Sequence, residues 1–310
     1  MDKEIEFLEN DFEFVGDAHD INKDAVEPAT PGWKDAINRF KANKGAVIGL
    51  VAIVIIVLLA LIAPLVSKWE PYTVETSLQN IKPFTSGHIF GTDAYGRDLW
   101  TRLWLGTRVS LLIAVVAIFI DVVIGMTYGL ISGYFGGIVD SVLQRIQEII
   151  NSIPTLVILT ILLMVLKASL GTIILALSFT EWIGMSRITR AQVLKVKEEE
   201  YVLASRTLGA GSFFIIFKEI LPNIFGQIII MVMMSIPNAI FYEAYLSFVG
   251  LGLPIPKASL GTLINDGYSA FLAHPYQMII PVIVFSILML AFNLFGDGLR
   301  DALDPTMKER

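Results

Sequence analysis

The chain has 310 residues, of which 55% are hydrophobic and 17% charged, and its formal net charge at pH 7 is −6. A mean hydropathy of +0.67 is too high for an ordinary soluble domain, so the composition predicts an all-α integral membrane protein. No cysteine is present, which excludes disulfides, thiolate nucleophiles and cysteine-ligated metals.

The first 33 residues differ in composition from the rest of the chain. Residues 1–27 hold ten acidic residues against Lys3 and Lys23, and Pro28 and Pro31 close the segment. This composition is typical of a flexible, solvated tail, and it lacks the basic start and apolar core of a cleavable signal peptide. We therefore expect an acidic cytoplasmic tail over 1–33 and a membrane domain over 34–310. The tail supplies the net negative charge, and the near-neutral remainder argues against a nucleic-acid partner.

Apolar segments follow one another along the membrane domain. A helix that crosses a bilayer needs roughly 20 apolar residues. Six segments are candidates: 46–66, 109–131, 149–166, 170–188, 224–246 and 278–294. The fourth is interrupted by Glu181 and Trp182. We expect six transmembrane helices.

Basic residues predict the orientation of these segments. Lys34, Arg39, Lys41 and Lys44 precede the first segment, and cytoplasmic flanks carry an excess of Lys and Arg. The N-terminus is therefore expected in the cytoplasm, and an even number of spans returns the C-terminus to the same side. Five basic residues between 67 and 108 act against the rule on the predicted outer side. The loop after the fourth segment agrees with it through Arg187, Arg190, Lys195, Lys197, Arg206 and Lys218.

A close-packing signal lies in the second segment. Gly125, Gly129 and Gly133 recur every fourth residue, which places bare backbone along one face of a helix. Such a face lets a second helix approach closely.

The charged loop over 191–222 has the pattern of a docking element. A helix is expected to end at Gly209, Ser212 to cap a second helix, and Pro222 to interrupt that second helix. On the first helix, Tyr201, Ala204 and Leu208 fall at i, i+3 and i+7, which predicts a narrow apolar stripe.

This loop resembles the coupling loop of ABC-importer permeases. In that family an E-A-A triplet is followed by a glycine four residues after its last position and by L-P twelve residues later. The corresponding places here hold Leu203-Ala204-Ser205, Gly209 and Leu221-Pro222. Leu203 replaces the family glutamate, and Glu219 stands where a hydrophobic residue or histidine is usual. The resemblance implies that the segment sits in a groove of a separate ATPase.

A second motif resembles one branch of the family. Residues 90–111, FGTDAYGRDLWTRLWLGTRVSL, are similar to the signature of peptide and nickel permeases. The segments 246–254 and 292–305 are similar to the same branch, so the resemblance runs from about Trp33 to Pro305. The signature matches at Gly91, Thr92, Asp93, Gly96, Arg97, Asp98, Thr101, Arg102, Gly106, Arg108, Ser110 and Leu111.

The resemblance implies a type I ABC importer permease fold and the second, C-type, permease subunit of an oligopeptide or dipeptide importer. It also implies a heterodimer with a homologous permease, two ATPase subunits, an extracytoplasmic binding protein and a place in the bacterial cytoplasmic membrane. Peptides and nickel chelates both remain open as substrates. The chain contains no G-x-x-x-x-G-K-(S/T) loop, so ATP and Mg²⁺ are expected on the partner subunits, and neither a cofactor nor an enzymatic activity is expected here.

Ionisable groups at membrane depth are costly and are therefore functional candidates. Asp121, Glu181 and Glu243 are of this kind. Asp121, together with Ser235 and Asn238 in the fifth segment, is a candidate for the translocation path. A proton-coupled secondary carrier using Asp121 is the alternative function, and a scaffold subunit that transports nothing is a third. His19, His88 and His274 show no ligand spacing, so no metal site is expected.

Overall fold

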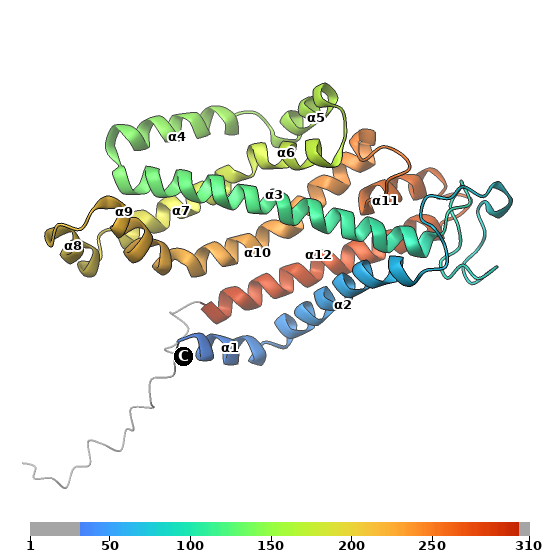
Figure 1. Ribbon diagram of the computed structural model, residues 1–310, viewed down its shortest axis with the longest axis horizontal. Coiled ribbons are helices and arrows are strands. Elements are labelled where there is room, and N and C mark those ends of the chain that lie inside the picture. Colours follow the sequence, from blue (N-terminus) through green and yellow to red (C-terminus); the bar gives the residue numbers. More distant parts are fainter. Residues whose placement is uncertain (1–31, 304–310) are drawn as a thin grey trace, which may run out of the picture.

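The computed structural model describes residues 32–303, and its regular elements within that range are all helical. The molecule is an elongated bundle whose long helices run side by side along one axis (Figure 1). These helices are α2 (Lys44–Val66), α3 (Leu99–Phe135), α10 (Leu221–Leu246) and α12 (Tyr276–Leu303). We name the two ends after the short helices there, the α8 end and the α11 end (Figure 1). The acidic tail predicted over 1–33 lies almost wholly outside the described residues.

Within the described range, four helices are long and apolar enough to cross a membrane. They are α2, α3, the continuous helix Ser212–Leu251 and α12. A fifth span results if α4 (Gly137–Asn151) and α5 (Thr155–Leu166), bent by 75°, count as one. The expected count of six therefore stays a prediction.

The predicted fourth span, 170–188, is divided. Helix α6 (Leu170–Thr180) stops at Glu181, and α7 (Trp182–Val196) starts directly after it. The candidate fourth span is therefore two helices, and the break falls at Glu181, the charged residue that interrupts the apolar run. The predicted second span was too short, because α3 begins ten residues earlier, at Leu99, where the Asp98 side chain caps it by accepting from the Thr101 N–H.

Short elements complete the chain at both ends. The α8 end carries α1 (Gly32–Ala42), α8 (Glu200–Thr207), α9 (Ser212–Phe214) and the π-helical segment η2 (Ile215–Ile220). At the α11 end lie η1 (Thr76–Leu78), the π-helical segment η3 (Ser247–Leu251) and α11 (Leu260–Ser269).

Helices α3 and α7 pack backbone to backbone. A Cβ atom at Gly125 would lie 2.5 Å from the Trp182 carbonyl oxygen, and one at Gly129 would lie 2.5 Å from that of Ser186. At Gly133 it would lie 2.8 Å from the Val193 Cβ. The close approach predicted from the glycine spacing is thus confirmed.

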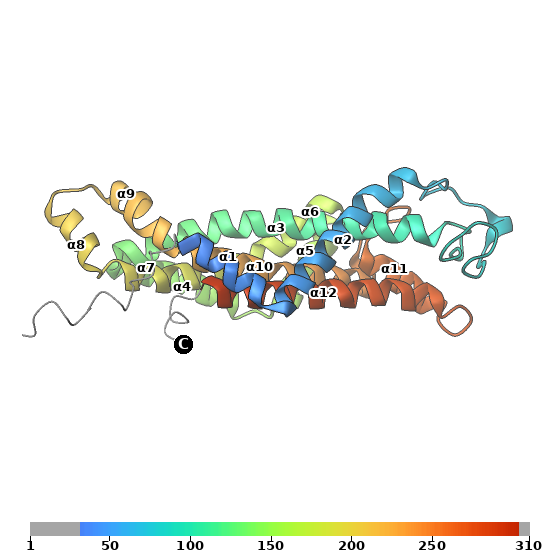
Figure 2. The same cartoon turned by 90° about the horizontal axis from the view of Figure 1, so that it is seen from below.

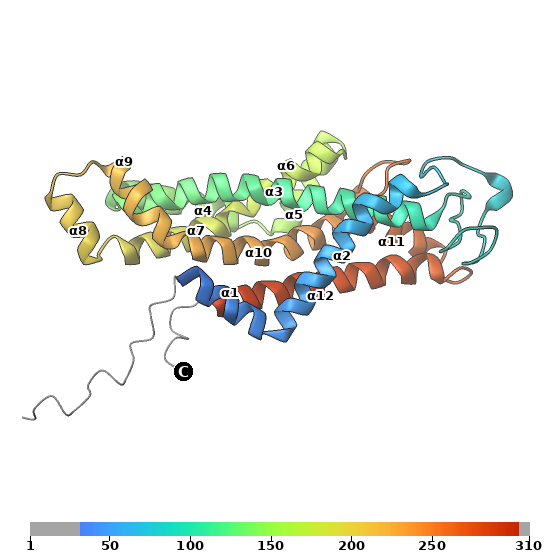
Figure 3. The same ribbon diagram turned by 60° about the horizontal axis from the view of Figure 1, so that its bottom comes forward.

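Helices α2 and α12 also pack against each other, and Figures 2 and 3 show α2 crossing α12 at an angle. A Cβ at Gly49 would lie 2.7 Å from the Ala291 carbonyl oxygen, so glycine again permits close contact. The outward side chains of α2 remain exposed; Ile48 and Leu65, for example, are 63% and 77% accessible. An apolar helix with such an outer surface requires an apolar surrounding, which fits a bilayer.

Candidate functional site

The signature segment folds into a tight loop ahead of α3. Gly91 and Gly96 adopt φ of +75° and +76°, in the left-handed region that favours glycine. A Cβ at either position would also collide with backbone: the Ile81 carbonyl oxygen for Gly91 and the Glu75 carbonyl oxygen for Gly96. Both glycines are therefore required for this conformation.

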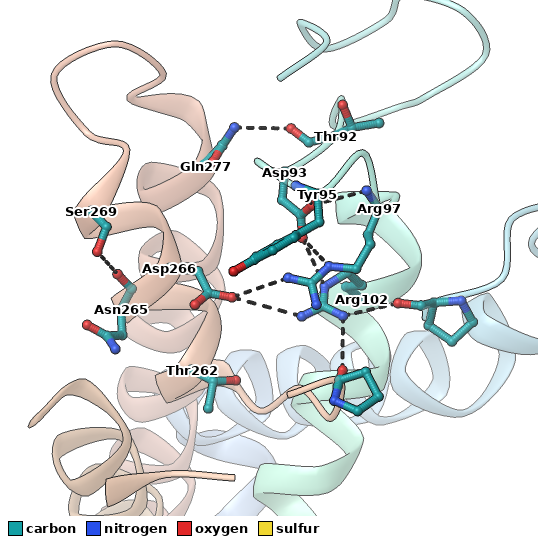
Figure 4. A network of polar contacts seen from close by, with 12 residues as sticks. Thr92, Asp93, Tyr95, Arg97, Arg102, Thr262, Asn265, Asp266, Ser269 and Gln277 are labelled. Atoms are coloured by element: carbon teal, nitrogen blue, oxygen red, sulfur yellow. Dashed lines mark hydrogen bonds and ion pairs between the residues drawn. The ribbon is translucent and has the colours of Figure 1, made fainter. Parts of the chain in front are cut away.

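Asp93 organises the turn between these glycines. Its Oδ1 accepts from the N–H groups of Tyr95 (2.8 Å) and Arg97 (3.0 Å). Its Oδ2 accepts from Arg97 Nε at 2.7 Å and lies 3.4 Å from Arg102 Nε. The Arg97 guanidinium also lies 4.5 Å from the centre of the Tyr95 ring, close enough for a cation–π contact (Figure 4).

Arg102 joins three distant parts of the chain. Its Nη1 donates to the carbonyl oxygens of Pro71 (3.1 Å) and Pro256 (3.2 Å). Its Nη2 lies 4.0 Å from Asp266 Oδ2, and Arg97 Nη2 lies 3.6 Å from the same oxygen (Figure 4). We call Asp93, Arg97, Arg102 and Asp266 the arginine clasp. Both arginines are 1% exposed, so their charges depend on the two carboxylates for compensation.

Asp98 has a different task from Asp93. Its Oδ2 accepts from the Thr101 N–H at 2.8 Å and from the Thr101 hydroxyl at 2.7 Å, and its Oδ1 is 2.8 Å from His88 Nδ1. It therefore caps α3, because it satisfies a donor that the first helical turn leaves unpaired.

The structure thus brings together the six signature residues selected from the sequence: Gly91, Asp93, Gly96, Arg97, Asp98 and Arg102. Asp266, on α11, is the member that the sequence did not indicate, since it lies more than 160 residues from the others and in no motif. Burial raises the pKa of the Asp266 carboxyl, and the charges of Arg102 and Arg97 oppose that rise.

The predicted docking loop occupies the opposite end of the molecule. Helix α8 ends at Thr207, and Gly209 has φ +83° with nothing within 4 Å of its Cβ position, so the expected left-handed bend is confirmed. Val202 is fully buried among apolar side chains of η2 and α7. Tyr201 and Leu208 are 40% and 89% exposed, and Ala204 is exposed too, which leaves this face of the segment open.

Two expectations for this loop were wrong. Ser212 does not cap the second helix, because Gly211 occupies the cap position and no side chain bonds there. Pro222 does not interrupt that helix, which continues from Ser212 to Leu251. The proline falls just after the π-helical turn η2, where Leu221 N donates to the Ile216 carbonyl. The wider turn shifts the hydrogen-bond register and so accommodates a residue without an N–H.

Glu219, a departure from the family pattern, has a local partner. The Ser205 hydroxyl donates to Glu219 Oε1 at 3.3 Å, which links α8 to η2. The side chain of Ser205, one of the predicted coupling residues, therefore contacts η2 of the same chain.

A salt bridge anchors the helix that leads into α8. Arg190 on α7 donates to both carboxylate oxygens of Asp140 on α4, at 2.7 and 2.6 Å. The Ser132 hydroxyl of α3 donates to the same carboxylate at 2.5 Å, and Lys197 Nζ donates to the Gly133 carbonyl at 2.9 Å. Helices α3, α4 and α7 are thereby tied together at the α8 end.

We expect Arg190→Ala to lower the stability of the protein by about 1–2 kcal/mol, because a two-pronged, partly buried ion pair is stronger than an exposed one. The stability of Arg190→Lys should lie between that of Arg190→Ala and that of the wild type, since an ammonium keeps the charge without the paired geometry. Thermal unfolding of the purified protein in detergent measures both. Equal melting temperatures for wild type and Arg190→Ala would show that the bridge contributes nothing.

The three candidate path residues are not joined by any hydrogen bond within the described range. Asp121 is 5% exposed and its Oδ1 has no hydrogen-bond partner. Ser235 donates to the Met231 carbonyl of its own helix at 2.9 Å, and Asn238 is exposed on α10. Their role in a path stays a prediction. Glu243, by contrast, is fully buried and accepts from Ser110 (2.7 Å) and Ser247 (2.8 Å).

Comparison with known proteins places these features in a family. Residues 125–309 match the family described as "Binding-protein-dependent transport system inner membrane component", and residues 32–83 match the "N-terminal TM domain of oligopeptide transport permease C". A chain of the solved MetNI methionine ABC transporter, in an inward facing conformation, is similar with a TM-score of 0.54. At 22% identity, over 66% of this chain and 96% of that chain, this likeness shows the fold.

Relatives similar over nearly the whole length are also known. The oligopeptide transport system permease protein OppC of Bacillus subtilis is 45% identical over 95% of both chains. The dipeptide permease protein DppC of the same organism is 44% identical over 91% of this chain and 88% of its own. OppC of Escherichia coli K12 is 37% identical, over 88% and 91%. The chain therefore belongs to the family of inner membrane components of binding-protein-dependent ABC transporters, in its oligopeptide and dipeptide permease C branch.

Proposed function

We propose that this chain is the membrane-spanning permease subunit of an ATP-driven importer that carries peptides across the bacterial cytoplasmic membrane. The observation that carries the proposal is the 45% identity, over 95% of both chains, to a permease named for oligopeptide transport. Peptide is therefore the first substrate to test, ahead of a nickel chelate.

The subunit works with partners. A second, homologous permease forms the other half of the membrane channel, two ATPase subunits bind ATP and Mg²⁺, and an extracytoplasmic binding protein delivers the peptide. This chain has no phosphate-binding loop of its own, so it supplies no nucleotide site. Ser235, Asn238 and Asp121 remain candidates for the channel lining.

The α8 end faces the cytoplasm in this proposal, with both termini on that side, and the α11 end faces outward. Support comes from the basic residues around α1 and between α7 and η2, because cytoplasmic segments are enriched in Lys and Arg. These include Lys41 on α1, Lys195 and Lys197 where α7 ends, and Lys218 on η2, while Lys44 starts α2 directly after α1.

The coupling step follows from the contacts at the α8 end. The ATPase subunits bind the exposed face of α8. When ATP binds, the two ATPase subunits close on each other and move that helix. Val202 packs α8 against η2 and α7, while Arg190 and Asp140 tie α7 to α4. The motion is therefore passed to a block of packed helices, and the channel changes from inward-open to outward-open. Hydrolysis and product release restore the first state.

A cross-linking experiment tests the docking face. The chain has no cysteine, so Leu208→Cys introduces a single thiol at a position that is 89% exposed. In the purified complex, a short thiol-reactive cross-linker should join it to an ATPase subunit identified by mass spectrometry. Leu272→Cys, fully exposed at the α11 end, is the matched control and should give no such product. Cross-linking of the ATPase to Leu272→Cys instead would reverse the proposed orientation.

Gly209→Val should abolish uptake while leaving the subunit in the membrane. The Cβ meets no neighbour, so the effect comes from the left-handed backbone, which a β-branched residue resists at a cost of about 1–3 kcal/mol. Gly211→Ala is the matched control, because Gly211 has φ −71° and equal space. Uptake by membrane vesicles and immunoblots of the membranes measure the two properties. Normal uptake by Gly209→Val would remove the bend from the coupling mechanism.

A further inference from the structure

A cavity of about 550 Å³ opens at the α11 end, between the turn that joins α5 to α6 and the loop that joins η3 to α11. This volume lies within the range of small-ligand pockets, about 300–1,000 Å³. The polar residues that line it are Lys167, Ser247, Lys257, Thr262, Asn265 and Asp266.

The floor of this cavity is built from buried polar groups. Ser247 is 2% exposed, and its hydroxyl donates to the fully buried Glu243 at 2.8 Å. Glu243 also accepts from the Ser110 hydroxyl, whose oxygen accepts from the N–H of Leu260 at 3.1 Å. Helices α3, α10 and α11 are thus fixed to one another beneath the cavity, which gives it a preformed shape.

One wall is acidic. Asp266 lines the cavity and its side chain is 39% exposed. The nearest clasp nitrogens, of Arg97 and Arg102, are 3.6 and 4.0 Å from its Oδ2, beyond good hydrogen-bond distance. The clasp therefore holds this carboxylate in place and leaves it free to accept a hydrogen bond from a ligand. Asn265 and Thr262 belong to the same helix, α11, and appear with Asp266 in Figure 4.

Two lysines from different elements also line the cavity. Lys167 lies in the α5–α6 turn and Lys257 in the loop before α11, and both are exposed. Lys167 has φ +60°, a conformation that is unfavourable for a residue with a side chain. Such backbone strain concentrates at functional sites. The cavity thus combines two cationic side chains with an accessible carboxylate.

We propose that this cavity binds a peptide as a zwitterion as it leaves the binding protein, with the peptide carboxylate held by Lys167 and Lys257 and its ammonium group by Asp266. Asn265 and Thr262 supply hydrogen-bonding groups for the peptide amides. This inference rests on the proposed function, since it names the features of the substrate that the outward end of the same subunit recognises.

The test uses the complete complex in proteoliposomes with ATP inside and the binding protein saturated with peptide outside. Two substrates are compared: a tripeptide with a free carboxylate and the same tripeptide as its C-terminal amide, with loading of the binding protein checked for both. In the double variant Lys167→Gln/Lys257→Gln, the maximal uptake rate of the free acid should fall about tenfold, because charge-assisted hydrogen bonds to the carboxylate are lost. Uptake of the amide should be unchanged. Lys82→Gln, an exposed outer-loop variant, should change neither.

Each other result overturns the inference. An equal fall for free acid and amide would mean that the lysines only support the structure of the loops. No fall for either would mean that the peptide does not use this cavity. Wild-type complex that imports neither peptide would overturn the proposed function itself, and the inference with it.

Discussion

Replacing Arg102 with alanine should destabilise the protein by about 3–5 kcal/mol, the largest effect that we expect from a single substitution here. The Arg102 side chain is 1% exposed and donates hydrogen bonds to the carbonyl oxygens of Pro71 and Pro256. It also forms ion pairs with the carboxylates of the clasp. Its loss leaves two carbonyl acceptors without this donor and Asp93 with only Arg97 as a charged partner. Thermal unfolding of the purified protein should show a large fall in melting temperature.

Arg145→Ala is the control for this experiment. The Arg145 side chain is 75% exposed and pairs with Glu148 three residues away. An exposed pair of this kind is worth about 0–1 kcal/mol, so the melting temperature should scarcely move. A melting temperature for Arg102→Ala equal to that of Arg145→Ala would show that the arginine clasp does not stabilise the α11 end.

Gly129→Val should separate α3 from α7 and cost about 3 kcal/mol, at the upper end of overpacking effects. A Cβ at this position would lie 2.5 Å from the Ser186 carbonyl oxygen and 3.0 Å from the Arg190 backbone nitrogen. Neither atom belongs to a flexible side chain, so one helix must shift as a whole. Because α7 leads directly into α8, uptake should be lost together with stability.

Gly226→Ala provides the matched control on α10, where a Cβ meets nothing within 4 Å. Alanine favours a helix over glycine by up to about 1 kcal/mol, so this variant should be as stable as wild type or slightly more stable. Melting temperatures of the purified proteins and uptake by vesicles compare the pair. A Gly129→Val protein with wild-type stability would show that α3 and α7 leave enough space between them for a valine side chain.

The parts of the fold that were predicted correctly are those governed by local patterns. The uncharged run 46–66 became α2, and the glycines at 125, 129 and 133 became the seam with α7, because apolar length and small-residue spacing act within one helix. The left-handed bend at Gly209 was predicted for the same reason. The signature residues from Gly91 to Arg102 were selected from their resemblance, and the structure adds what their side chains do.

What the sequence did not reveal depends on contacts between distant segments or on neighbouring turns. Asp266 completes the clasp from another helix, and no local pattern marks it. Pro222 is tolerated because the preceding π-helical turn changes the hydrogen-bond register. The N-cap of the helix that follows α8 is Gly211 and not Ser212. The interruption at Glu181 is visible in the sequence, but only the structure shows that it divides the segment into two helices.

Peptide uptake into vesicles that contain this chain with its permease, ATPase and binding-protein partners distinguishes an ATP-driven importer from a proton-coupled carrier. One set of vesicles holds ATP, and a second has an imposed proton gradient without ATP. We predict vanadate-sensitive uptake in the first set and no uptake in the second. In the Asp121→Asn variant, too, the proton gradient should drive no peptide uptake. Uptake driven by the proton gradient alone, and abolished by Asp121→Asn, would contradict the importer and establish a secondary carrier instead.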